Sequence, residues 1–275
     1  MKKVYFFFLL LIAIETNAQL SDFQNVNFSK SDSIALFYKN SELTNLPKLA
    51  HQLTIDFTSD VEKFRAIYTW VSSNISNDYG MFQKNKRKRR KYKNDDIKLK
   101  KWNDVLLKKM FRQLLKEKKT VCTGYAYLIK ELSQLAGINC EIVDGFGRLS
   151  STNIENLKRP NHSWNAVELN GKWYLCDPTW SSGTTNLSNN EFIFKYNEGY
   201  FLASPELFVK NHYPLNEKWI LIDGKKPTFK EFLESPLLYG NAFNYLTDNS
   251  FPQKMANTVK KYEKILFKYK LLKPQ

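Results

Sequence analysis

The chain has 275 residues, 43% hydrophobic and 15% aromatic, so it can form one packed globular domain with an appendage. It has no Gly-rich phosphate loop, no internal repeat and no Cys/His cluster with zinc spacing. These features argue against a P-loop nucleotide-binding protein, a repeat protein and a structural metal. The net charge of +15 is uneven, because residues 84–119 hold 17 lysines and arginines against four acids.

The first 18 residues have the pattern of a secretory signal peptide. Two lysines precede an apolar run from Val4 to Ile14, and small or polar residues lead to a cleavage site after Ala18. The run is too short to span a bilayer, and no later segment is long and apolar enough to do so. We therefore expect an exported protein, periplasmic or extracellular. An uncleaved N-terminal anchor is the alternative.

Helical structure is expected in the region that follows. Residues 19–50 are polar with scattered apolar positions, which predicts loops and one or two short helices packed on the core. From Val61 to Ser72, apolar residues recur at the spacing of one buried helix face. The aromatic residues on that face, including Trp70, are expected in the core.

A dense cationic run comes next, made up of Lys84, Lys86, Arg87, Lys88, Arg89, Arg90 and Lys91. The run would repel itself and holds no apolar residue before Tyr92, so we expect an exposed, mobile loop. It is either a solvated surface or a contact for an anionic envelope polymer or membrane surface. The signal-peptide pattern argues against nucleic acid, and no nucleic-acid partner is expected. Residues 97–115 then return to helical spacing with a basic face.

Cys122 lies where another helix is expected to begin. Thr120 is the expected N-cap, the apolar residues that follow share one face, and Gly137 ends the helix. A helix N-terminus lowers the pKa of a thiol and presents free backbone N–H groups. Both effects suit a thiolate nucleophile and the binding of an oxyanion, for which the Cys122 N–H is one expected donor.

His162 and Asp177 fall on two strand-like runs joined by Asn170-Gly171, a strong hairpin signal. In a two-residue hairpin Trp164 lies opposite Asp177, and His162 is a diagonal neighbour on the same face, about 7–8 Å away. The imidazole and the carboxylate can therefore meet. With Cys122 they supply a nucleophile, a base and a group that orients the base. The alternative for His162 is a histidine of the core or of a strand end.

These segments resemble the transglutaminase-like superfamily. The run Val-Cys-Thr-Gly-Tyr-Ala-Tyr-Leu around Cys122 is similar to its nucleophile helix. Asn-His-Ser-Trp-Asn-Ala-Val and Trp-Tyr-Leu-Cys-Asp-Pro-Thr-Trp are similar to its histidine and aspartate strands. Residues 62–70 and 200–219 extend the likeness to bacterial members similar to kyphoscoliosis peptidase, so that it covers residues 55–235. The chain departs from the family pattern at Ser76-Asn77, where an aromatic residue is usual, and in the basic insertion.

The resemblance implies an α+β fold of the transglutaminase-like or papain-like type, with a nucleophile helix packed on an antiparallel sheet. It also implies acyl transfer at an amide through a thioester on Cys122, with His162 as the base and Asp177 as its orienter. We favour an exported cysteine hydrolase that acts on peptide or protein amides. A protein-cross-linking transglutaminase and a non-catalytic binding module are the alternatives. Trp164 and Trp180 are candidate substrate-binding residues or structural aromatics, and no cofactor is implied.

Cys140 and Cys176 are expected to be buried free thiols. In a three-stranded meander they would lie at opposite ends of the first and third strands. That is too far apart for a disulfide, which needs a Cα separation of about 4.4–6.8 Å. The remaining histidines, His51 and His212, are isolated in the sequence, and no metal is expected.

The expected organisation is a signal peptide (1–18), an N-terminal extension (19–54), a catalytic domain (55–215) with a basic insertion (84–101), and a C-terminal extension (216–275). Residues 259–272, near the end of the chain, allow two interpretations. Some apolar residues alternate as in a strand, and others recur at the spacing of one helix face.

Overall fold

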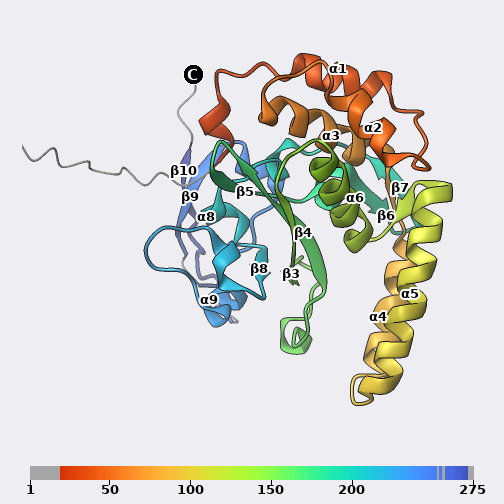
Figure 1. Ribbon diagram of the computed structural model, residues 1–275. Helices are drawn as coiled ribbons and strands as arrows, with labels where there is room; N and C mark the ends of the chain where they lie inside the picture. Colours follow the sequence, from red (N-terminus) through yellow and green to blue (C-terminus); the bar gives the residue numbers. More distant parts are fainter. Residues whose placement is uncertain (1–18, 253, 256–257, 272–275) are drawn as a thin grey trace, which may run out of the picture.

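The computed structural model describes residues 19–252, 254–255 and 258–271. The expected signal peptide lies outside the described residues. Within the described part of the chain, no helix is both long enough and apolar enough to cross a membrane. Helices and an antiparallel sheet combine in an α+β fold, as the sequence predicts (Figure 1).

The longer helices lie mostly in the first half of the chain. The α-helices are α1 (Ser29–Phe37), α2 (Leu46–Thr54), α3 (Asp60–Asn74), α4 (Tyr79–Lys91), α5 (Asp96–Glu117), α6 (Cys122–Leu135), α7 (Pro178–Ser182), α8 (Pro205–Phe208), α9 (Phe229–Glu234) and α10 (Gly240–Phe243). The strands are β1 (Ser76–Asn77), β2 (Lys119–Thr120), β3 (Cys140–Gly147), β4 (His162–Leu169), β5 (Lys172–Cys176), β6 (Gly183–Asn186), β7 (Glu191–Phe194), β8 (His212–Pro214), β9 (Leu246–Phe251) and β10 (Lys268–Leu271).

The central sheet has four antiparallel strands in the order β5-β4-β3-β8. β4 and β5 form the expected hairpin, in which Leu169 pairs with Lys172. Asn170 and Gly171 make the turn with φ angles of 52° and 76°, a backbone region that these two residues adopt readily. The predicted register is therefore confirmed, and it fixes the face to which each side chain of β4 points.

β8 reaches the sheet from much later in the chain and pairs with β3, where His212 lies opposite Gly147. Two glycines of β3 make room for its neighbours. A Cβ atom on Gly145 would lie 2.2 Å from the Tyr213 carbonyl oxygen, and one on Gly147 would lie 2.9 Å from the His162 Cβ. These glycines allow β4 and β8 to bring two histidines close together on either side of β3.

Apolar side chains pack on both faces of the sheet. On one face, α6 lies between the sheet and α3, and Leu128 of α6 shares a cluster with Val167 of β4. Trp70 belongs to the same cluster and is fully buried, as predicted. On the other face, Trp164 packs in a second cluster with Phe208 of α8. Helices α1 and α2 add to the first cluster and cover α3 (Figure 1).

The prediction of a loop at residues 84–91 is wrong, because these residues form most of α4. α4 and α5 make a helical hairpin that projects from the body (Figure 1). Trp102 of α5 donates a hydrogen bond from Nε1 to Asn85, and the ammonium groups of Lys84 and Lys88 lie 5.8 and 5.5 Å from its ring. An aromatic surface that accepts cations therefore stabilises the helix despite its charge. The predicted helix at residues 97–115 is confirmed as part of α5.

Cys140 and Cys176 are free, as predicted, but their placement at opposite ends of the sheet is wrong. Cys140 pairs with Val167 of β4, and Cys176 pairs with Asn165. The two cysteines are thus offset by only two positions, with β4 between them. One intervening strand alone separates their backbones by about 9.5 Å, which already exceeds the reach of a disulfide.

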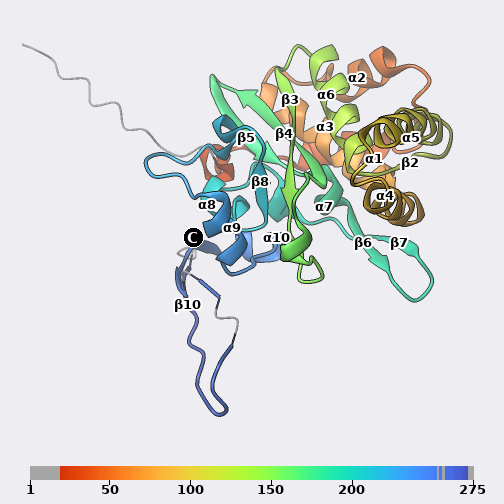
Figure 2. The same ribbon diagram turned by 90° about the horizontal axis from the view of Figure 1, so that it is seen from below.

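The carboxyl-terminal residues form the antiparallel hairpin of β9 and β10, which projects from the body in Figure 2. Residues 268–271 are strand and the described residues before them from 258 onward are irregular. The helical interpretation of this segment is therefore wrong.

Candidate active site

Cys122 is the first residue of α6, and it is partly exposed. It follows β2, which pairs in parallel with β1, so this strand pair determines where the helix begins. The N-cap is Val121 instead of the expected Thr120, and no side chain caps the helix. Because the first N–H groups of a helix lack intrahelical partners, this uncapped turn is suited to bind an oxyanion.

Thr120 has a different role from the one expected. It is fully buried and packs against the first turn of α6. Gly124 allows this contact, because a Cβ atom there would lie 2.0 Å from Thr120 Oγ1. The close approach of the helix to β2 fixes the position of Cys122.

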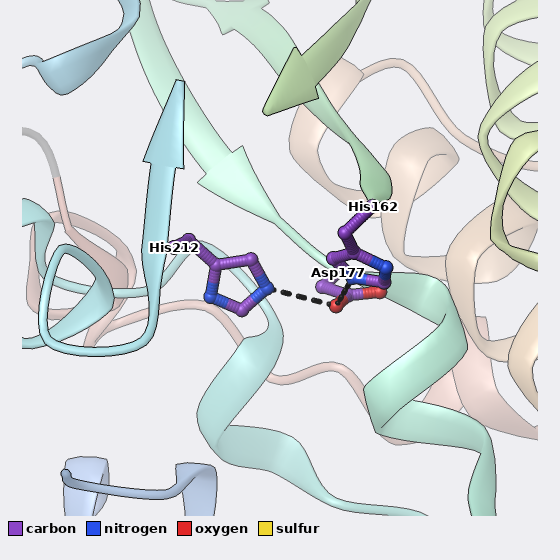
Figure 3. A group of neighbouring side chains, drawn as sticks. All are labelled: His162, Asp177 and His212. Atoms are coloured by element: carbon purple, nitrogen blue, oxygen red, sulfur yellow. Dashed lines mark hydrogen bonds and ion pairs between the residues drawn. The ribbon is translucent and has the colours of Figure 1, made fainter. Parts of the chain in front are cut away.

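His162 and Asp177 meet as the hairpin register requires (Figure 3). His162 begins β4, Asp177 follows β5, and His162 Nε2 lies 2.7 Å from Asp177 Oδ2. Asp177 is also the N-cap of α7, and its Oδ1 accepts hydrogen bonds from the N–H groups of Thr179 and Trp180 at 2.8 and 3.1 Å. Both oxygens of this fully buried carboxylate are therefore engaged, and its orientation is fixed.

The His162 side chain also acts on the Cys122 thiol, through hydrogen bonding and through its charge. Asp177 engages Nε2, so Nδ1 is the ring nitrogen left for this interaction. Burial acts to raise the pKa of the Cys122 thiol, but the hydrogen bond and the charge of His162 outweigh it and lower that pKa. Burial acts to lower the pKa of His162, but Asp177 and Cys122 raise it to about 10. Both shifts favour the pair of a thiolate and an imidazolium over the neutral pair.

His212 is the residue of this site that the sequence interpretation missed. Its Nε2 lies 3.0 Å from the same Asp177 Oδ2 that binds His162, and it is fully buried (Figure 3). Burial lowers the pKa of His212 to about 4, against the opposing effect of Asp177, while Nδ1 of the ring lies 2.6 Å from Asn211 Oδ1. Burial acts to raise the pKa of Asp177, but the two rings hold it well below its usual range.

Aromatic rings enclose the two histidines. Trp180 stacks on His162 with ring centroids 4.9 Å apart, and Phe208 stacks on His212 at 3.9 Å. Trp164 contacts both histidine rings and is only 1% exposed, whereas Trp180 is partly exposed. The substrate-binding role of either tryptophan stays a prediction, and the exposure favours Trp180.

Polar side chains lie on the other side of Cys122. Hydrogen bonding from the Ser163 backbone also acts to lower the pKa of the Cys122 thiol. The Ser163 hydroxyl donates to Asp144 Oδ1 at 2.6 Å and lies 3.4 Å from Thr123 Oγ1. The backbone next to His162 therefore adds to the effect of the His162 ring on the thiol.

His162, Asp177 and His212 could also supply metal ligands, since one ligand atom of each lies within 4.8 Å of the others. Both Nε2 atoms, however, point to a single carboxylate oxygen at hydrogen-bond distance. A metal bound there would occupy the imidazole that contacts Cys122. The hydrogen bond to Asp177 fixes the orientation of the His162 ring.

The structure therefore brings together the three residues proposed for catalysis, and their catalytic roles stay predictions. The local fold explains the grouping, because α6 supplies Cys122 while two adjacent strands supply His162 and Asp177.

Known proteins are similar in sequence to the part of the chain that holds these segments. The profile of the transglutaminase-like superfamily matches residues 47–178. Kyphoscoliosis peptidase of Mus musculus is 33% identical over 202 residues, which cover 73% of this chain and 27% of that protein. Hillarin of Drosophila melanogaster is 27% identical over 237 residues, which cover 80% of this chain and 26% of that protein. The chain thus spans about a quarter of the length of these relatives.

Among solved structures, one described as a TGase aligns with a TM-score of 0.32 and 20% identity, and the alignment covers 57% of this chain and 34% of that one. The profile match includes Cys122, His162 and Asp177. Through residues 47–178, the chain belongs to the transglutaminase-like superfamily.

Proposed function

We propose that this protein is a cysteine hydrolase that acts on peptide or protein amides. The main observation in support is the His162 ring, which forms a 2.7 Å hydrogen bond with Asp177 and, through its interaction with Cys122, lowers the pKa of the thiol. This arrangement lowers the pKa of the nucleophile and raises that of the general acid, which is the combination that acyl transfer at an amide needs. The similarity to a kyphoscoliosis peptidase supports hydrolysis of peptide bonds in particular.

The first half of the reaction forms a thioester. The Cys122 thiolate attacks the amide carbonyl carbon, and the carbonyl electron pair moves to the oxygen, where N–H groups of the first turn of α6 stabilise it. The carbonyl then re-forms as the C–N bond breaks, and His162 gives its Nδ1 proton to the leaving nitrogen. The amine departs, and the acyl group stays on Cys122.

The second half regenerates the enzyme. His162, now neutral, removes a proton from water, and the resulting hydroxide attacks the thioester carbonyl. The C–S bond breaks, the carboxylic acid product leaves, and the thiolate is restored next to a protonated His162. Asp177 keeps Nδ1 directed at Cys122 throughout, because it binds the proton on Nε2.

The test is mass spectrometry of the protein and its products after incubation with a library of peptide amides, with and without a primary amine. Peptide acids formed in both conditions support the hydrolase, and Cys122→Ala is the inactive control. Products that carry the added amine, formed in preference to acids, would support a protein-cross-linking transglutaminase. A folded protein that gives neither product nor an acyl adduct would instead be a binding module.

We also propose that the protein is exported, on the basis of its first 18 residues. The test is fractionation of expressing cells followed by sequencing of the mature N-terminus. A chain that begins at Gln19 outside the cytoplasm supports export, whereas an intact N-terminus in the cytoplasm contradicts it.

A further inference from the structure

Helix α4 carries a dense set of cations that its own chain does not neutralise. Seven lysines and arginines lie between residues 84 and 91. In the described part of the chain, none of them has a carboxylate within salt-bridge distance. The ion pairs of this hairpin involve Lys98 with Asp95 and Arg159 with Asp96. Like charges at this density repel one another, so binding of an anion would stabilise the helix.

Arg89 places this charge next to the candidate active site. Its Nη2 donates a 2.9 Å hydrogen bond to the carbonyl oxygen of Pro160, two residues before His162. A second contact fixes the hairpin against the same loop, because Arg159 donates to the Lys93 carbonyl oxygen at 2.8 Å. The end of α4 is therefore attached to the segment that leads into β4, and it does not move freely in solvent.

The charged groups that act on Arg89 include residues of the candidate active site. Burial and the nearby Arg159 lower the pKa of Arg89, while the charges of Cys122 and Asp144 act in the opposite direction. Asp144 is exposed and binds the hydroxyl of Ser163, the residue next to His162. A ligand held by Arg89 would consequently lie beside the segment that carries His162.

Helical spacing determines which residues share the side of α4 that carries Arg89. Lys86 precedes it by three residues and Phe82 by seven, so both lie on the same face, and both are exposed. Arg87 is two residues away and points to the opposite side of the helix. The face next to the active site therefore combines an apolar ring with two cations.

We propose that Phe82, Lys86 and Arg89 form a subsite that holds an acidic segment of a polypeptide substrate beside Cys122. The proposal rests on the proposed hydrolase function and specifies its substrate class. Arginine suits this task because its planar guanidinium binds a carboxylate through two parallel hydrogen bonds. An acidic polypeptide fits better than a membrane surface, because Arg89 lies against the segment that leads to His162, so an extended chain bound there can continue into the candidate active site.

The test measures the binding of peptides without their turnover. It uses the full mature chain with Cys122→Ala, which removes the proposed nucleophile. Fluorescent peptides of equal length, with Glu, Gln or Lys flanking a central amide, are titrated at low and high salt. We expect the Glu peptide to bind about tenfold more tightly than the Gln peptide, with the preference reduced by salt. Arg89→Gln should lower affinity for the Glu peptide about tenfold, and Arg87→Gln should lower it less than about twofold.

Arg89→Lys is the control for a loss of binding that is caused by misfolding. It keeps the positive charge and should retain part of the preference for the Glu peptide. Thermal unfolding and labelling of Cys122 in otherwise wild-type protein then verify that each variant is folded. Equal binding of the three peptides by the folded protein would overturn the proposal. The proposal would also be overturned if Arg89→Gln and Arg87→Gln lowered the affinity for the Glu peptide equally and the protein bound only to anionic vesicles. Helix α4 would then be assigned to a membrane surface. Binding with this preference but without turnover would leave the subsite intact and reject only the hydrolase.

Discussion

Asp177 and His212 are joined by a 3.0 Å hydrogen bond from His212 Nε2 to Oδ2, the same oxygen that binds His162 at 2.7 Å. The carboxylate that orients the proposed base is thus itself held by a second ring. His212 is fixed in turn by Asn211, whose Oδ1 lies 2.6 Å from Nδ1, and by stacking on Phe208. We therefore consider His212 a positioning residue that acts through Asp177.

Replacement of His212 by alanine should lower kcat more than it changes KM. Loss of the ring removes one of the hydrogen bonds that fix Asp177, and it leaves a cavity beside Phe208 and Trp164. We expect kcat to fall by about 10–100-fold and the free energy of unfolding by about 2–4 kcal/mol. Steady-state kinetics and urea unfolding measure the two effects. His51→Ala, at an exposed position of α2, is the matched control, and an unchanged kcat in His212→Ala would remove His212 from the site.

The buried His212 should also make the protein less stable in mild acid. The pKa of His212 is about 4 in the folded protein, whereas the ordinary value of 6.5 applies in the unfolded chain. Between pH 4 and pH 6.5 the unfolded chain therefore binds more protons than the folded protein. The stabilisation is complete above pH 6.5 and is lost as the pH falls through 4. The change is on the order of 3 kcal/mol. Urea unfolding from pH 7 to pH 4 should show this decrease, and His212→Gln should flatten it.

The hairpin that carries His162 and Asp177 could be predicted because local rules determine it. Asn170-Gly171 sets the turn, and the two-residue period of strands then places both side chains on one face. The start of α6 at Cys122 follows from local spacing as well, although the true N-cap is one residue later than expected.

His212 could not be placed from the sequence, because the strand that carries it pairs across a long separation. It follows Asp177 by 35 residues, and no short-range turn fixes the register of β8 on β3. The available signal was the alternation of Gly145 and Gly147, which marks a strand with neighbours at very close approach. The charge of residues 84–91 does not by itself predict their helix, because the aromatic ring of Trp102 that accepts Lys84 and Lys88 belongs to the next helix.

Asp177→Asn should reduce both the rate and the stability. The amide oxygen can still accept from Thr179 and Trp180, but the amide nitrogen then faces the Nε2 atoms of both His162 and His212. Each ring must move its proton to Nδ1, which blocks the position where His162 binds the Cys122 proton. We expect kcat to fall by about 10³–10⁴-fold and the free energy of unfolding by about 1–3 kcal/mol. Kinetics and thermal unfolding measure these effects, with Asp104→Asn, at an exposed position of α5, as control. A fully active Asp177→Asn variant would contradict the role of Asp177.

Cys122 should react with iodoacetamide long before the other two cysteines. Its pKa is lowered by His162, whereas burial raises the pKa of Cys140 to about 12 and that of Cys176 well above its usual value. Because the thiolate is the reactive form, labelling of Cys122 should persist at pH values well below the ordinary thiol pKa of about 8.5. Peptide mapping after timed labelling from pH 5 to pH 9 measures the rate at each cysteine. His162→Gln should shift the midpoint for Cys122 back toward that of a free thiol while Cys140 and Cys176 stay unlabelled. Equal labelling of all three cysteines in the folded protein would remove Cys122 as the nucleophile.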